Sequence, residues 1–192
     1  MAEKTIKDGL KYPFANWKRL FNFWWILTIV GIFSVIGYFV EITENLLKKK
    51  NKELPEFKGF WRLFKKGFLF FAVTIIPVIF SIWTLGIVDK LARGITAGEL
   101  LYLTIAIFID LFLAILFINY IKKGNFEAVF EYKKAWKVVS KNYKATLMTL
   151  LKQTVVGLIL LFASIPVITM LVTIPAMSFV SYYFLVELYN NA

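Results

Sequence analysis

The sequence contains no cysteine and no histidine among its 192 residues. The chain therefore forms no disulfide, and it lacks the thiolate and imidazole ligands of common zinc sites. A cysteine nucleophile and a histidine general base are excluded as well. A glycine-rich phosphate loop, a G-x-S-x-G motif and a carboxylate metal motif are also missing. We therefore expect no enzyme, no catalytic residue, no metal site and no cofactor.

Apolar residues, in contrast, make up 59% of the chain and lie in long blocks. Soluble domains are about 45–50% apolar, and about 20 apolar residues suffice for a helix to cross a membrane. The pattern predicts an all-α integral membrane protein with about four to five transmembrane helices plus amphipathic interfacial helices. Residues 1–192 form one membrane domain, with apolar segments 20–43, 67–88, 100–121, 146–164 and 167–189.

The last two segments come from one apolar stretch that is too long for a single crossing, and Pro166 lies near its midpoint. We expect the chain to turn there.

The net charge of +11 comes from lysine and arginine clustered beside the apolar segments. Residues 41–66 hold 8 basic residues and residues 122–144 hold 7, against 2 in 89–99. The positive-inside rule places the two richer loops in the cytoplasm of a multi-pass protein of the cell membrane. A full crossing by 20–43 then leaves the basic N-terminus outside. A re-entrant hairpin that bends near Gly31 is the alternative, although the length of the block favours a full crossing.

Aromatic stripes flanked by basic residues occur three times, in the predicted interfacial helices 5–19, 54–66 and 126–144. Helical spacing places the aromatic residues on one face, as in a helix that lies among lipid headgroups. Ordinary aromatic belts with positive-inside charges would look similar. We expect anionic lipid headgroups as partners, and no nucleic acid. The predicted lipid-contacting residues are Trp17, Lys18, Arg19, Phe57, Trp61, Arg62, Phe64, Lys65, Lys66, Trp136, Lys137 and Lys141.

Asp110 lies near the middle of an apolar segment. A carboxylate at a helix centre costs about 2.5–3.5 kcal/mol of insertion free energy, and such residues usually face the bundle interior and pair. Lys152 is the predicted partner, and Asn119 and Gln153 would complete a polar cluster at membrane depth. The cluster serves either helix packing or the passage of protons or ions.

A short motif lies between the first two apolar segments. Its residues are Gly37, Tyr38, Leu54, Pro55, Glu56, Phe57 and Gly67. In these residues, and in Tyr12-Pro13 followed by Trp17, the sequence resembles the family called domain of unknown function 4013, polytopic membrane proteins found largely in archaea. The resemblance implies a membrane protein of archaeal type and no activity. Glu41 stands where many family members look basic.

These features favour a non-enzymatic scaffold that organises the membrane or its partners. The alternative is a small transporter or channel subunit that uses Asp110. Assembly with a second copy or with another membrane protein would suit a chain of this size.

Overall fold

The computed structural model describes residues 5–27, 29–49, 53–93, 98–141, 143–164 and 167–191. Every element in these ranges is a helix, which confirms the predicted all-α fold. In chain order the elements are α1 (Ile6–Phe14), η1 (Trp17–Leu27), α2 (Ile29–Leu47), α3 (Phe60–Ala92), α4 (Gly98–Lys123), η2 (Phe126–Phe130), α5 (Tyr132–Lys141), α6 (Tyr143–Ala163) and α7 (Val167–Asn191).

Four of the described helices are long and apolar enough to cross a membrane, namely α3, α4, α6 and the Thr169–Asn191 part of α7. They make the chain an all-α membrane protein of the predicted kind. The turn expected near Pro166 lies outside the described residues.

The apolar block 20–43 is not one helix. It divides between η1, which ends at Leu27, and α2, which begins at Ile29. The second half of α2 carries Glu41 and Glu44, whose charges suit headgroup or water contact better than hydrocarbon. The full crossing and the re-entrant alternative both stay predictions. Gly31, the predicted bend of the re-entrant hairpin, lies within α2.

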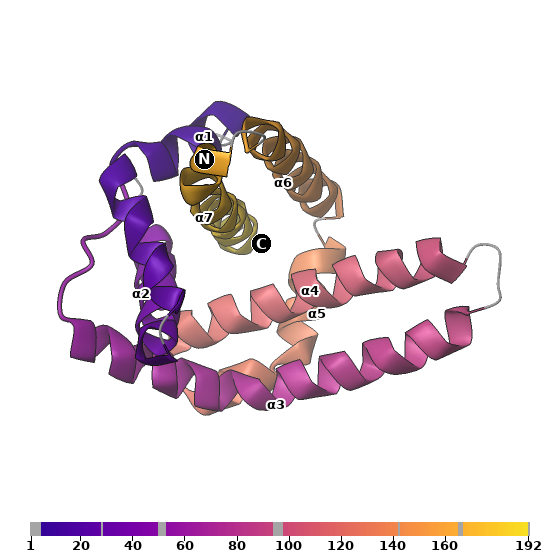
Figure 1. Ribbon diagram of the computed structural model, residues 1–192. Coiled ribbons are helices and arrows are strands. Elements are labelled where there is room, and N and C mark those ends of the chain that lie inside the picture. The colour runs from indigo at the N-terminus through magenta and orange to yellow at the C-terminus, as the bar shows by residue number, and fades with distance from the viewer. Residues whose placement is uncertain are drawn as a thin grey trace.

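Helices α3 and α4 form a long antiparallel hairpin that extends to one side of the other helices (Figure 1). The remaining helices gather around α7, which contacts α1, η1, α2 and α6. Half of the spanning window of α7 is buried, against 17–22% in the other three candidate spans. Helix α7 is therefore the central helix, whereas α3, α4 and α6 present most of their apolar surface outward.

The segment predicted as an interfacial helix at 54–66 has a different structure. Residues 54–59 are not helical, and α3 begins only at Phe60, after Gly59 with its left-handed φ of 73°. From there α3 continues without a break into the apolar span. Its 33 residues give about 50 Å at 1.5 Å per residue, whereas the hydrocarbon core is about 30 Å thick. The basic first turns of α3 thus continue directly into a helix that is long and apolar enough to cross a membrane.

The other two predicted interfacial segments also divide. Residues 5–19 contain α1 and the start of η1, and residues 126–141 contain η2 and α5. Asn142, within the predicted range 126–144, lies outside the described residues.

Candidate functional site

The motif residues converge where α2, the segment 53–59 and the start of α3 meet. We call this junction the α2–α3 clasp and define it by Gly37, Tyr38, Leu54, Pro55, Glu56, Phe57 and Gly67. The two glycines mark its helix crossing. A Cβ on Gly37 would overlap the carbonyl oxygen of Leu63, and a Cβ on Gly67 would overlap the carbonyl oxygen of Phe33. Only glycine allows the two backbones to approach this closely.

Tyr38 and Arg19 fasten the non-helical segment to the bundle. The Tyr38 hydroxyl donates a hydrogen bond of 2.7 Å to the Pro55 carbonyl oxygen, and its fully buried ring packs edge-on against Phe57. The Arg19 guanidinium donates to the Leu54 carbonyl oxygen and lies 3.4 Å from the Glu56 carboxylate. Because these backbone carbonyls accept side-chain donors, the segment needs no helical hydrogen bonds of its own.

Two ion pairs join the flanks of α2 and α3. Arg62 lies 3.0 Å from Glu41, and Lys66 lies 2.7 Å from Glu44. These two basic residues, predicted as lipid contacts, thus neutralise acids of the same chain, and their contact with lipid stays a prediction. Arg19, with a side chain only 16% exposed, also binds within the protein. The Arg62 guanidinium is thus the counter-charge of the Glu41 carboxylate within the fold.

A second polar junction, the α5 latch, centres on buried Asn119 of α4. Its Nδ2 donates to the Ala128 carbonyl oxygen at 2.8 Å and to Glu131 at 3.1 Å. Its Oδ1 accepts from Lys134 Nζ at 2.6 Å and from the Tyr189 hydroxyl at 2.8 Å. All four hydrogen-bonding positions of the amide are used. The latch therefore connects α4, η2, α5 and α7 through one side chain.

Charge reinforces the latch. Lys123 pairs with Glu131, and hydrogen bonds from Lys123 and Asn119 lower the pKa of the Glu131 carboxyl group. Burial lowers the pKa of Lys134, the nearby charge of Lys123 adds to this effect, and Glu131 opposes it. Glu131, Lys134 and Tyr189 are site residues that sequence reasoning missed. The available signal was Glu131, an acidic residue within a lysine-rich loop.

Residues 20–177 match the model of a family described as "Protein of unknown function (DUF4013)". The chain belongs to this family. The match includes every residue of the α2–α3 clasp and of the α5 latch except Tyr189, and it confirms the family that the motif resembles. The archaeal origin that the resemblance implies stays a prediction. No curated protein matches the chain, and no solved structure matches it.

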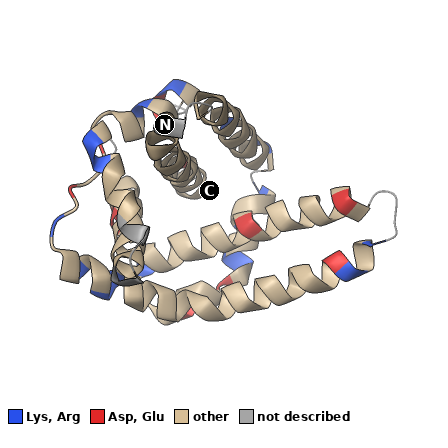
Figure 2. Cartoon of the chain, in the orientation of Figure 1, with Lys and Arg blue, Asp and Glu red and all other residues tan. Residues whose placement is uncertain are grey.

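In this DUF4013 protein the three tryptophans of the aromatic stripes remain at the surface. Trp17, Trp61 and Trp136 are 52%, 67% and 56% exposed. Exposed lysines accompany them, namely Lys18, Lys65, Lys137 and Lys141. Phe57 and Phe64, in contrast, are partly buried and pack within the protein. Figure 2 shows basic residues gathered on the segments that surround the α2–α3 clasp and on α5.

The structure separates the residues of the predicted intramembrane cluster. Asp110 and Gln153 line one hollow of about 400 Å³ between α4, α6 and α7. Lys152 lines a different hollow, together with Glu187, and Asn119 belongs to the α5 latch. The structure thus does not bring Asp110 and Lys152 to one hollow. The Gln153 side chain, which shares the hollow of Asp110, donates to the Ser181 carbonyl oxygen at 3.1 Å. Among the described residues, no group of three or more metal-ligating side chains occurs.

Asp110 is exposed on α4, and in the described part of the chain it has no ion-pair partner. We expect Asp110→Leu to raise the thermal midpoint in lipid nanodiscs, because it removes a charge that costs about 2.5–3.5 kcal/mol at a helix centre. The thermal midpoint of Asp110→Asn should lie between those of Asp110→Leu and the natural protein. Thr104→Leu is the control at another exposed position of α4, since the Thr104 hydroxyl already donates to the Leu100 carbonyl oxygen. A lower midpoint for both Asp110 variants would show that the carboxylate stabilises the fold.

Proposed function

We propose that this DUF4013 protein is a non-enzymatic membrane-organising protein that gathers anionic lipids around its basic, aromatic segments. The observation that carries the proposal is the surface around the α2–α3 clasp. Lys18 and Lys65 are exposed there, beside Trp17 and Trp61. Among the described residues, neither lysine forms an ion pair. Each basic residue near an anionic membrane surface contributes about 1 kcal/mol of binding free energy.

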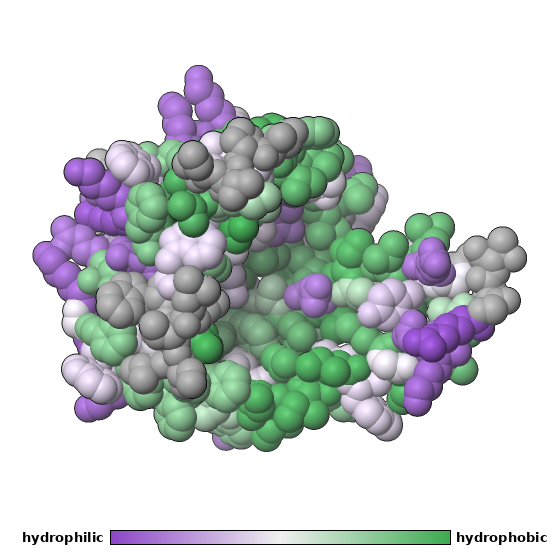
Figure 3. Space-filling model, viewed as in Figure 1, coloured by the Kyte–Doolittle hydropathy of each residue, from purple (hydrophilic) through white to green (hydrophobic). Residues whose placement is uncertain are grey.

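The distribution of polar surface supports a spanning orientation. Figure 3 shows mostly apolar residues over the middle of this face, with one hydrophilic group among them, and hydrophilic residues along its left and upper edges and near the tip of the α3–α4 hairpin. The tip carries Asp89, Lys90 and Arg93, of which Arg93 pairs with Asp89 at 2.6 Å. An apolar band between two polar ends is the pattern that a bilayer requires.

The hairpin also supports one location for the two basic loops. Phe70 of α3 packs against Phe117 and Tyr120 of α4 at 5.6 and 5.9 Å between ring centroids. The start of α3 therefore lies beside the end of α4, so the loops 41–66 and 122–144 reach the same side of the membrane. By the positive-inside rule we assign that side to the cytoplasm.

The test measures lipid selectivity around the full-length protein in liposomes. The fraction of spin-labelled lipid immobilised by the protein is compared for phosphatidylglycerol and phosphatidylcholine by electron paramagnetic resonance. We expect at least a twofold preference for phosphatidylglycerol, which falls toward one in Lys18→Gln/Lys65→Gln and weakens at high salt because exposed charges are screened. The controls are Lys18→Arg/Lys65→Arg, which keeps both charges, and Lys90→Gln at the opposite end of the hairpin.

Two results would contradict the proposal. One is equal immobilisation of both lipids by the natural protein. The other is an ion flux across the same liposomes that Asp110→Asn abolishes, which would favour a transporter or channel subunit instead.

A further inference from the structure

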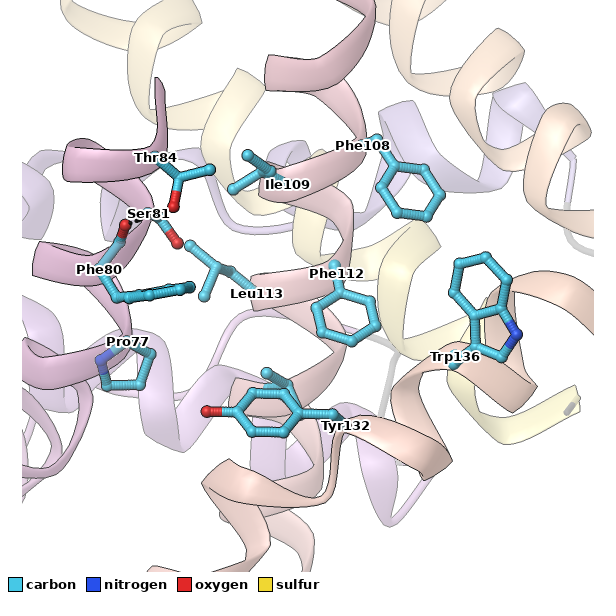
Figure 4. Close-up of a pocket in the computed structure, with 11 residues that line it drawn as sticks. Pro77, Phe80, Ser81, Thr84, Phe108, Ile109, Phe112, Leu113, Tyr132 and Trp136 are labelled. Carbon is cyan, nitrogen blue, oxygen red and sulfur yellow. Dashed lines mark hydrogen bonds between the residues drawn. The ribbon is translucent and has the colours of Figure 1, made fainter. Parts of the chain in front are cut away.

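An apolar groove of about 400 Å³ lies between α3, α4 and α5, outside both polar junctions (Figure 4). Phe80 and Ser81 contribute from α3, and Phe108 and Phe112 from α4. The Tyr132 and Trp136 rings of α5 close the groove on its third side. Its volume falls within the range of about 300–1,000 Å³ found for small-molecule sites.

Aromatic contacts hold α5 in place over the groove. Tyr132 stacks on Phe112 with ring centroids 6.2 Å apart, and Trp136 meets Phe108 edge-on at 6.0 Å. The groove is thus formed by side chains of three elements. Its wall is suited to hydrocarbon, since even the Thr84 hydroxyl donates to the Phe80 carbonyl oxygen at 2.8 Å.

The charges on α5 are arranged beside this apolar wall. Lys133 and Lys137 are exposed and lie four residues apart, so they share one helix face next to the Tyr132 and Trp136 stripe. Lys134, in contrast, donates to Asn119 within the protein. Glu131, the acid next to α5, is already bound to Lys123 and Asn119, and Glu127 lies in the preceding helix η2. The exposed flank of the groove therefore presents two cations that have no ion-pair partner in the described residues.

The depth of α5 favours an anionic partner for its exposed lysines. Phe112 precedes Lys122 by 10 residues, which is about 15 Å along α4. Tyr132 packs on Phe112, so Lys133 begins at a level within the span of α4. Ammonium groups beside hydrocarbon are stable when they are paired with an anion or reach the interface.

We propose that this groove binds one hydrocarbon chain of an anionic phospholipid, whose phosphate group contacts Lys133 and Lys137. The inference rests on the proposed function and deepens it by assigning one lipid to one site. The two lysines complement the phosphate, and the groove volume suits a single chain. A second copy of the protein would need a contact area above about 1,000 Å², which a hollow of this size does not supply.

The test uses the full-length protein in liposomes with a phosphatidylglycerol that carries a photoreactive diazirine at the end of one chain. A phosphatidylcholine with the same chain serves as the second probe, and labelled peptides are mapped by mass spectrometry. We expect adducts of the anionic probe to concentrate on the α3 and α4 peptides that contain Phe80, Phe108 and Phe112. Lys133→Gln/Lys137→Gln should lower these adducts at least fivefold and leave phosphatidylcholine labelling unchanged.

Two further variants sharpen the test. Lys7→Gln/Lys11→Gln removes two exposed lysines at the same spacing on α1, and it should leave groove labelling unchanged. Thr84→Phe places a ring in the groove and should remove the chain adducts of both probes, with its thermal midpoint checked in parallel.

Uniform labelling along all apolar helices, unchanged labelling in Lys133→Gln/Lys137→Gln, or a crosslink between two copies through α5 would overturn the lipid site. These results are separable from a failure of the proposed function. If the groove is not labelled while the lipid preference that depends on Lys18 and Lys65 is intact, only the lipid site is overturned. A labelled groove without that preference overturns the wider proposal alone.

Discussion

Gly67→Ala is expected to lower the free energy of unfolding by at least about 2–3 kcal/mol, the upper part of the range for an overpacked core. The added Cβ would overlap the Phe33 carbonyl oxygen and crowd the Gly37 backbone nitrogen. Both atoms belong to the backbone of α2, so no side chain can rotate away to make room. Relief requires α2 and α3 to separate, which also stretches the pairs between Glu41 and Arg62 and between Glu44 and Lys66.

Gly86→Ala is the matched control for this substitution. Gly86 lies on the same helix and a Cβ there meets no atom within 4 Å. Alanine favours the helix over glycine by about 1 kcal/mol, so Gly86→Ala should leave stability unchanged or raise it. Thermal and denaturant unfolding of both variants in the same detergent measures the difference. Equal stability of the two variants would show that α2 and α3 do not meet at their glycines.

The α2–α3 clasp explains why the sequence motif is built from glycine, tyrosine and proline rather than from chemically reactive groups. Gly37 and Gly67 permit the helix crossing, whereas Tyr38 and Pro55 fix the segment between the helices through one hydrogen bond. The motif is therefore a requirement of the fold. The lipid contacts that we propose involve instead the exposed residues that surround it, such as Lys18 and Lys65.

The fold class was predictable because the membrane imposes a simple rule on sequence. A hydrocarbon environment requires long apolar helices with satisfied backbone groups, so apolar block length indicates where spans occur. The same rule does not identify contacts between distant segments. Block 20–43 has spanning length, yet Glu41 at its end and Glu44 just beyond it pair with residues of α3.

Residues of the candidate site were predictable only where their position on one helix face determines whether they are exposed. Trp17, Trp61 and Trp136 follow helical stripes and are exposed as those stripes suggest. Arg62 and Lys66 follow the same pattern, but they pair with Glu41 and Glu44 of α2, which periodicity along one segment cannot show. Depth along a helix likewise suggested Lys152 for Asp110, whereas helix rotation presents Gln153 there.

Asn119→Ala is the second substitution for which we expect a large effect, a loss of about 3 kcal/mol. Each buried polar group left without a partner costs about 1–3 kcal/mol. The change removes the partner of the Tyr189 hydroxyl and of the Ala128 carbonyl oxygen, and one partner each of Lys134 and Glu131. Helix α5 should loosen first, because the latch is its main polar attachment to α4 and α7.

Hydrogen–deuterium exchange in nanodiscs measures this loosening. Deuterium uptake should rise in peptides that cover Tyr132–Lys141 in Asn119→Ala, while the Gly37–Gly67 crossing keeps its protection. Asn125→Ala is the control, because Asn125 is exposed and its side chain makes no capping hydrogen bond.

A double-mutant cycle that combines Asn119→Ala with Tyr189→Phe distinguishes the hydrogen bonds of the latch from the packing of the Asn119 side chain. Tyr189 donates to Asn119 at 2.8 Å, so the two substitutions should be non-additive by about 0.5–3 kcal/mol, as expected for residues in one network. Additive losses would mean that Asn119 acts through packing alone. Since Tyr132 and Trp136 of α5 form one wall of the apolar groove, Asn119→Ala should also lower lipid labelling there, whereas Asn125→Ala should not.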